Sequence, residues 1–236
     1  MMKRQNIHEI IRQGVIVSCH ADDGMRDEAI FAYFVQAAVA GGAVALRIEG
    51  AERVRNTRSQ TELPIIGFAE GCYADGAMLI TPTMDAIDAL FAAGADAVAV
   101  DVTKRKRPDG TDGFIFFEQA RKRFTGLLWA DVANFREGIR AAEIGADFIA
   151  TTLSGHTPGT ATYDYRTPDY VLIRELSHSL TIPVIAEGRI WTPEAAVEAL
   201  RAGAHAVVVG SAITRPRIIT TTFVEALKEQ AETHRG

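Results

Sequence analysis

A short phrase of glycine, alanine and an apolar run recurs four times along the chain, at residues 41–46, 93–100, 145–150 and 202–209. The glycine is typical of the left-handed residue that ends a helix, and the unbroken apolar run is typical of a strand covered on both faces. The copies lie roughly 50 to 60 residues apart, about twice the length of one strand–helix unit. A further strand is therefore expected between successive copies.

Short apolar runs introduced by Gly or Pro supply those strands, at residues 14–18, 64–68, 127–130 and 183–186. Helical stretches such as 84–93 and 193–202 separate the strands, and Pro193 suits a first helical turn. Eight strand–helix units predict a single (β/α)8 TIM barrel over residues 1–236, with a short amphipathic helix within residues 1–12. An open doubly wound sheet is the alternative, but its Gly-x-Gly-x-x-Gly motif does not follow the first strand.

The composition narrows the classes of partner. With 25 Lys and Arg against 30 Asp and Glu, the net charge is −5, and 47% of the residues are hydrophobic. Nucleic acids and anionic membranes require a basic surface and are therefore not expected as partners. No apolar run reaches the roughly 18 residues of a membrane span. Cys19 and Cys72 are too few for a disulfide framework, so a cytoplasmic protein is expected.

Polar residues follow each predicted strand, where the active sites of TIM barrels lie. These residues are Cys19 and His20, Arg47 and Glu49, Glu70, Asp101, Asp131, Thr151 and Thr152, Glu187 to Arg189, and Gly210 and Ser211. Partly buried charges need partners or a ligand. The pattern therefore predicts a polar active site at the mouth of the barrel, and a ring of structural salt bridges is the alternative.

Four of these residues are carboxylates, and crowding raises carboxyl pKa values toward the range of a general base. Mg²⁺ binding is the competing interpretation, but no paired ligand motif supports it, so no metal is predicted. His20 could orient a substrate hydroxyl, act as an acid or be structural. The basic residues 104–107 are expected to form a loop of solvated charges.

Glycines after the last two strands predict an anion site. Gly188, Gly210 and Ser211 allow backbone N–H groups to approach a phosphate, as in many barrels. Arg215 could add a bidentate contact, although an exposed arginine at the start of the last helix is equally compatible with the sequence. The expected ligand is a phosphate ester.

The residues in these segments, taken together, resemble the N-acetylmannosamine-6-phosphate 2-epimerase family. The similar segments lie at residues 15–19, 44–50, 64–67, 80–83, 101–110, 151–155, 185–188 and 210–216, in the order of the family. The resemblance implies a bacterial barrel enzyme that interconverts N-acetylmannosamine 6-phosphate and N-acetylglucosamine 6-phosphate in amino-sugar and sialic acid breakdown, without cofactor or metal. The implied partner is a phosphorylated amino sugar, and a homodimer is one assembly to consider.

The resemblance also assigns residues. Arg47, Asp131, Glu187 and Arg215 match family positions, and Thr152 is expected to contact the sugar. Two positions differ: His20 replaces a glutamine, and Glu70 replaces a lysine regarded in the family as the base that removes the C2 proton.

This replacement leads to a hypothesis for the chemistry. Glu70 would act as the base, Glu187 would protonate the sugar or assist ring opening, and Arg47 and Asp131 would hold and polarise it. The alternatives are an epimerase or isomerase for another phosphosugar, or a non-catalytic phosphosugar-binding protein.

Overall fold

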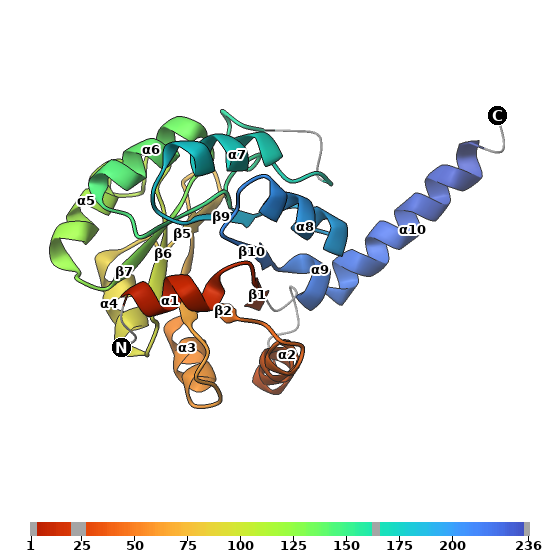
Figure 1. Ribbon diagram of the computed structural model, residues 1–236, viewed down its shortest axis with the longest axis horizontal. Helices are drawn as coiled ribbons and strands as arrows, with labels where there is room; N and C mark the ends of the chain where they lie inside the picture. Colours follow the sequence, from red (N-terminus) through yellow and green to blue (C-terminus); the bar gives the residue numbers. More distant parts are fainter. Residues whose placement is uncertain (1–3, 20–26, 162–165, 234–236) are drawn as a thin grey trace.

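The computed structural model describes residues 4–19, 27–161 and 166–233. Eight parallel strands close into a barrel in the order β1-β10-β9-β8-β7-β6-β3-β2 (Figure 1). Their bounds are β1 Val15–Cys19, β2 Ala45–Glu49, β3 Ile65–Phe68, β6 Ala97–Asp101, β7 Leu127–Asp131, β8 Phe148–Ala150, β9 Val184–Glu187 and β10 Ala206–Val209. The predicted (β/α)8 barrel is confirmed.

Helices alternate with the barrel strands and surround them. Their bounds are α1 Arg4–Ile11, α2 Glu28–Ala40, α3 Ala51–Arg58, α4 Met84–Ala92, α5 Gly113–Arg123, α6 Phe135–Ile144, α7 Tyr170–Ser179, α8 Pro193–Arg201, α9 Ser211–Thr214 and α10 Pro216–Thr233. Short polar side chains cap several of them: Thr192 accepts from the Ala195 N–H ahead of α8, with Pro193 in the first turn. Caps of this kind satisfy N–H groups that have no partner within the helix.

The four repeated glycines adopt the predicted left-handed conformation. The φ angles of Gly42, Gly94, Gly145 and Gly203 are 89°, 102°, 108° and 108°. Each glycine follows a helix and lies three residues before the first residue of the next strand. The repeat therefore marks the helix-to-strand turns that precede alternate strands of the barrel: β2, β6, β8 and β10.

Large apolar side chains fill the inside of the barrel. The rings of Trp129 and Phe148 are fully buried, with centroids 5.0 Å apart. Helix α1 closes the amino-terminal end of the barrel, because Ile7 and Ile11 pack in the same buried cluster. The cavity described below opens at the other end, where the strands finish.

A two-stranded antiparallel hairpin, formed by β4 (Glu70–Cys72) and β5 (Met78–Ile80), was not expected from the sequence. It follows β3 and pairs Glu70 with Ile80 and Cys72 with Met78. Directly opposed residues of an antiparallel pair share one face. Glu70 therefore lies on the same face of the hairpin as Ile80.

The expectation that residues 104–107 form a solvated loop is wrong for its arginines. Arg107 is only 2% exposed, and it donates to the carbonyl oxygens of Thr81 and Asp101. Its guanidinium lies 3.7 Å from the ring centroid of Phe116. Arg105 pairs with Asp101 at 2.7 Å. The ring of Phe116 and two carbonyl oxygens contact Arg107, and the carboxylate of Asp101 pairs with Arg105, so both charges have partners inside the protein.

Helix α10 extends away from the barrel beyond α9 (Figure 1). Among the described residues, no helix combines the length and apolar character that crossing a membrane requires.

Candidate active site

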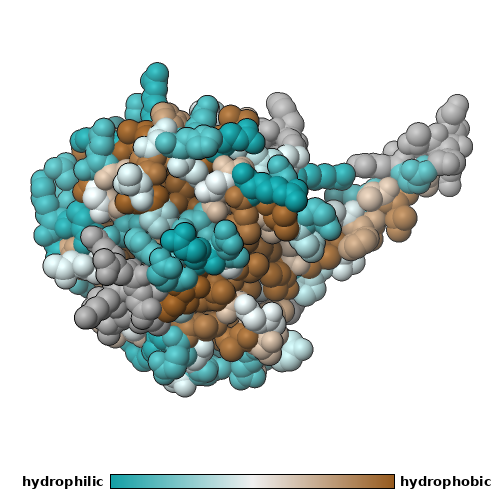
Figure 2. All heavy atoms as spheres, in the orientation of Figure 1, coloured by the Kyte–Doolittle hydropathy of each residue, from teal (hydrophilic) through white to brown (hydrophobic). Residues whose placement is uncertain are grey.

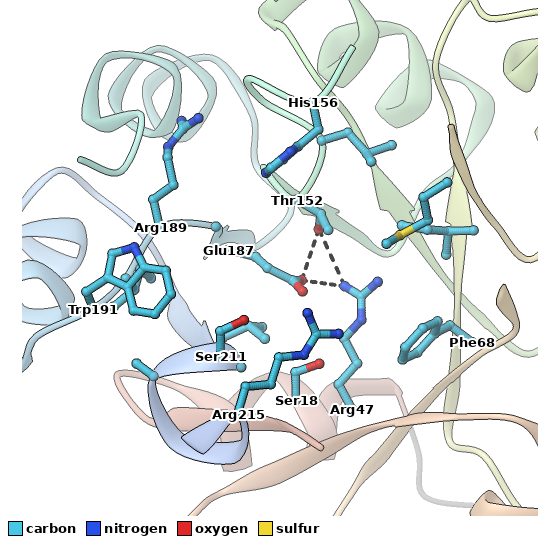
Figure 3. A pocket seen from close by; sticks show the side chains of 18 of the residues that line it. Ser18, Arg47, Phe68, Thr152, His156, Glu187, Arg189, Trp191, Ser211 and Arg215 are labelled. Atoms are coloured by element: carbon cyan, nitrogen blue, oxygen red, sulfur yellow. Dashed lines mark hydrogen bonds and ion pairs between the residues drawn. The ribbon is translucent and has the colours of Figure 1, made fainter. Parts of the chain in front are cut away.

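A cavity of about 500 Å³ opens at the carboxyl end of the barrel. The loops after β8, β9 and β10 and the β4–β5 hairpin contribute to its wall (Figure 3). The predicted site residues that line it are Arg47, Thr152, Glu187, Gly188, Gly210, Ser211 and Arg215. The structure thus brings most of the predicted residues to one place.

Arg47 is the centre of a buried polar network in this cavity. Its guanidinium binds both carboxylate oxygens of Asp131, at 3.2 and 2.7 Å, and also donates to Glu187. Thr152 Oγ1 lies 2.7 Å from Asp131 Oδ1 and 2.9 Å from Glu187 Oε2. The ring of Phe68 lies beneath the guanidinium, 4.9 Å from ring centroid to Cζ. These contacts fix Arg47 in a single orientation.

Two carboxylates share this one arginine, and their pKa values respond to it. Burial raises the pKa of Asp131 above its ordinary value, although Arg47 opposes the rise. Burial alone would lower the pKa of Arg47, but the charges of Asp131 and Glu187 outweigh this effect and raise it. Arg47 therefore stays protonated and carries one positive charge for two acidic groups.

Glu187 is the carboxylate of this network that reaches the cavity. It ends β9, and its side chain is 12% exposed, whereas Asp131 is fully buried. Burial, with the neighbouring charge of Asp131, raises the pKa of Glu187 to about 7 despite the opposing charge of Arg47. A carboxyl group with a pKa near 7 can both donate and accept a proton at neutral pH.

The other side of the cavity is cationic. Gly188 has a φ of 108°, Gly210 precedes the short helix α9, and both line the cavity together with Ser211. Arg215 Nε is buried and has no hydrogen-bond partner in the part of the chain that the structure describes, and the same is true of Arg189 Nε. Figure 3 shows the Arg215 side chain running along the cavity beside Ser211. Such a group is suited to an anionic ligand.

Two residues predicted to contribute do not line the cavity, and a third lies outside the described residues. Glu70 is exposed on β4 and does not line the cavity. Asp101 is buried at the end of β6, where it accepts from Tyr73 Oη at 3.0 Å and pairs with Arg105. His20 lies outside the described residues.

Several cavity residues were not singled out by the sequence analysis, among them Met78 of the hairpin, His156 of the loop after β8 and Trp191 of the loop after β9. Arg189, which directly follows a predicted phosphate-binding glycine, is one of the polar residues predicted after a strand, and it also lines the cavity. His156 lies six residues beyond the end of β8, too far from the strand for a pattern of strand ends to mark it.

Among residues 4–19, 27–161 and 166–233, no three His, Cys, Asp or Glu side chains gather as metal ligands would. The carboxylate oxygens of Asp131 instead bind Arg47 and Thr152.

The chain is similar in sequence to a known protein family. A family model for "Putative N-acetylmannosamine-6-phosphate epimerase" matches residues 31–229. The chain belongs to this family. Its curated relatives include a 2-epimerase of this designation from Caldanaerobacter subterraneus subsp. tengcongensis, 43% identical over 96% of each chain. Another, from Yersinia pseudotuberculosis, is 43% identical over 100% of this chain and 98% of its own.

The family extends to solved structures. The N-acetylmannosamine-6-phosphate 2-epimerase from Clostridium perfringens superposes with a TM-score of 0.86 at 37% identity, covering 96% of this chain and 98% of its own. The thiamine phosphate pyrophosphorylase from Pyrococcus furiosus, at 18% identity and a TM-score of 0.58, shares the fold alone. In this member of the family, Arg47, Asp131 and Glu187 form the buried network described above.

Proposed function

We propose that this protein is a 2-epimerase that interconverts N-acetylmannosamine 6-phosphate and N-acetylglucosamine 6-phosphate, as part of amino-sugar and sialic acid breakdown. One observation carries the proposal: a single cavity combines Glu187, held by Arg47 and Thr152, with the unpaired guanidinium nitrogen of Arg215. The first group suits proton transfer and the second suits a phosphate. Family membership supports the same substrate class.

The phosphate would bind at the cationic side. Backbone N–H groups near Gly188, Gly210 and Ser211 would approach its oxygens, since the first N–H groups of a helix such as α9 have no partner within it. Arg215 would add a charge-assisted contact, because its Nε has no competing hydrogen-bond partner among the described residues. This end holds the substrate without taking part in the reaction.

The sugar would lie over Arg47 and Glu187. Epimerisation breaks the C2–H bond of the ring-opened sugar, and the electron pair forms a C1=C2 double bond with negative charge on O1. Return of a proton to the opposite face of C2 completes the reaction. Arg47, with Asp131 keeping it charged and oriented, would stabilise the negative charge. Glu187 would exchange a proton with the sugar.

The assignment of Glu70 as the base stays a prediction. Its side chain is exposed, but it shares the face of the hairpin on which Ile80 contacts the cavity. The Glu187→Gln and Glu70→Gln variants separate the two carboxylates, because each replaces one acid by an amide of the same size. We expect Glu187→Gln to lose epimerisation, and a loss in Glu70→Gln would assign that residue a part in the chemistry.

The proposed activity is tested by incubating the protein with N-acetylmannosamine 6-phosphate and following the anomeric proton signals by NMR. The expected result is a mixture with N-acetylglucosamine 6-phosphate that is reached from either side. Thermal shifts with other phosphosugars distinguish the alternatives, because a ligand at 100 times its Kd stabilises by about 2.7 kcal/mol. Turnover of a different phosphosugar, or stabilisation without any turnover, would contradict the proposal.

We also propose that the protein forms a homodimer through α10. Phe223 and Leu227 lie one turn apart on this helix and are 69% and 71% exposed, with Val224 beside them. Figure 2 shows hydrophobic residues on the projecting helix and on the neighbouring face of the barrel. A second copy is the occupant that covers both apolar surfaces at once, because a two-fold axis places each helix against the other chain.

The assembly is measured by analytical ultracentrifugation of the full chain. A dimer is expected for the natural protein, and Leu227→Glu should shift it toward the monomer. Thr222→Glu, exposed on the side of the same helix away from Val224 and Leu227, is the matched control and should remain a dimer. A monomeric natural protein, or an unaffected Leu227→Glu variant, would contradict the proposed interface.

A further inference from the structure

We infer that His156 is a second proton-transfer residue of this cavity, acting on the face of C2 opposite to the one that Glu187 serves. The inference rests on the proposed epimerase function. It assigns a role to a residue that no strand-end pattern identified.

Inversion at C2 sets the requirement. One residue removes the proton from one face, and the electron pair of the C–H bond moves into the C1=C2 double bond. Another residue then delivers a proton to the other face, and the double bond returns its electrons to C2. After one turnover the two residues have exchanged protonation states, which solvent restores. Glu187 is held on one side by Arg47 and Thr152, so it cannot serve both faces of a sugar that stays in place.

The cavity contains few groups able to exchange a proton. Its ionisable lining residues within the described chain are Arg47, His156, Glu187, Arg189 and Arg215. Arginine keeps its proton in proteins because its pKa exceeds about 12. Glu187 and His156 remain as the two residues that can act as acid and base.

Two other acidic residues are less well placed than His156 for this proton transfer. Asp131 is fully buried, and Arg47 and Thr152 occupy its carboxylate oxygens. Glu70 is exposed on the hairpin and lies outside the lining. Neither presents a free carboxylate oxygen to the cavity.

The loop after β8 brings His156 to the cavity. Thr152, at the start of this loop, contacts Glu187, and Arg189 donates to the carbonyl oxygen of Ser154 at 3.0 Å. These contacts tie the loop to the end of β9. Figure 3 shows the imidazole extending from the loop toward the space beside Thr152 and Glu187, with Arg215 on the far side of the cavity.

The charges around His156 favour its neutral form. The residue is exposed at the rim, but the cavity wall partly desolvates its ring, and this burial is the main reason that its pKa is lowered. Arg189 from the loop after β9 and Arg105 from the loop after β6 lower it further. A neutral imidazole accepts a proton at neutral pH.

The test compares full-length His156→Gln, Glu187→Gln and the natural protein, each given either epimer in D₂O. We expect His156→Gln to lose interconversion by roughly 100-fold or more, yet to exchange the C2 hydrogen of one epimer with retention of configuration. Glu187→Gln should exchange the C2 hydrogen of the other epimer. His178→Gln, on the exposed surface of α7, is the matched control and should behave as the natural protein.

Three results are decisive. His156→Gln that interconverts the epimers within about threefold of the natural rate overturns the inference. A folded His156→Gln that binds phosphosugar but exchanges neither epimer also overturns it, because a two-residue mechanism leaves one half-reaction intact. Absence of interconversion by the natural protein contradicts the proposed function itself and is thereby distinguished from both.

Discussion

Replacing Arg47 by Met removes the one positive charge that serves two buried carboxylates. Arg47 is 2% exposed, Asp131 is fully buried and Glu187 is 12% exposed. Removing one partner of a buried ion pair costs about 3–5 kcal/mol of folding free energy, because the remaining charge is left without compensation. Two carboxylates lose the same partner here, so at pH 8 we expect a cost at the upper end of this range.

The cost of Arg47→Met should also depend on pH. Without Arg47, the pKa values of Asp131 and Glu187 rise further, since that arginine is what lowers them. A proton taken up by a carboxyl group recovers about 1.4 kcal/mol per pH unit below its pKa. Between pH 8 and pH 6, the penalty should therefore shrink by roughly 1–3 kcal/mol.

Urea unfolding followed by tryptophan fluorescence measures both quantities. Arg140→Met is the matched control, because Arg140 and Glu143 form an ion pair whose side chains are 51% and 58% exposed. Its loss should change the free energy of unfolding by less than about 1 kcal/mol. An Arg47→Met penalty below about 1 kcal/mol at pH 8, or one that does not shrink at pH 6, would refute the reasoning.

Three further outcomes are expected. Arg215→Met should raise KM for the phosphosugar roughly tenfold or more with little change in kcat, because a phosphate contact is equally strong in the ground state and in the transition state. Steady-state kinetics measure both constants, with exposed Arg201→Met as the control. An unchanged KM would count against the phosphate assignment. Tyr73→Phe removes the hydroxyl that donates to Asp101 at 3.0 Å and so ties the β4–β5 hairpin to the barrel. Faster amide hydrogen exchange in the hairpin is expected. Unchanged exchange would show that this hydrogen bond does not stabilise the hairpin. Because the pKa of Glu187 rises from 4.5 to about 7 on folding, the folded state binds more protons than the unfolded state between these pH values, and stability falls as pH rises through this window. Glu187→Gln should therefore flatten the dependence of the urea unfolding midpoint on pH. An unaltered dependence would contradict the raised pKa.

Much of the barrel could be predicted from the sequence because its local signals agree with the final packing. Gly145 needs a left-handed conformation to end its helix, and the apolar run after it needs cover on both faces. Arg47 and Glu187 were found in the same way, since each lies at or near the end of a strand whose neighbours are apolar.

The remaining features depend on contacts between distant segments. Arg107 is buried because Phe116 and two carbonyl groups meet it in space, and nothing adjacent to it in the sequence shows this. The hairpin that carries Glu70 has strands of three residues each, too short for an alternating pattern. His156 reaches the cavity through the course of a loop, which strand-end reasoning does not follow.

The isotopic composition of the product at C2 tests the central claim most directly. The protein is given N-acetylmannosamine 6-phosphate in D₂O, and the N-acetylglucosamine 6-phosphate formed at low conversion is analysed by mass spectrometry and NMR. Proton transfer through Glu187 and a second residue predicts one solvent deuterium at C2 in the product. Product that keeps its original hydrogen at C2 would contradict this mechanism, because the hydrogen would then have been returned without exchange with solvent.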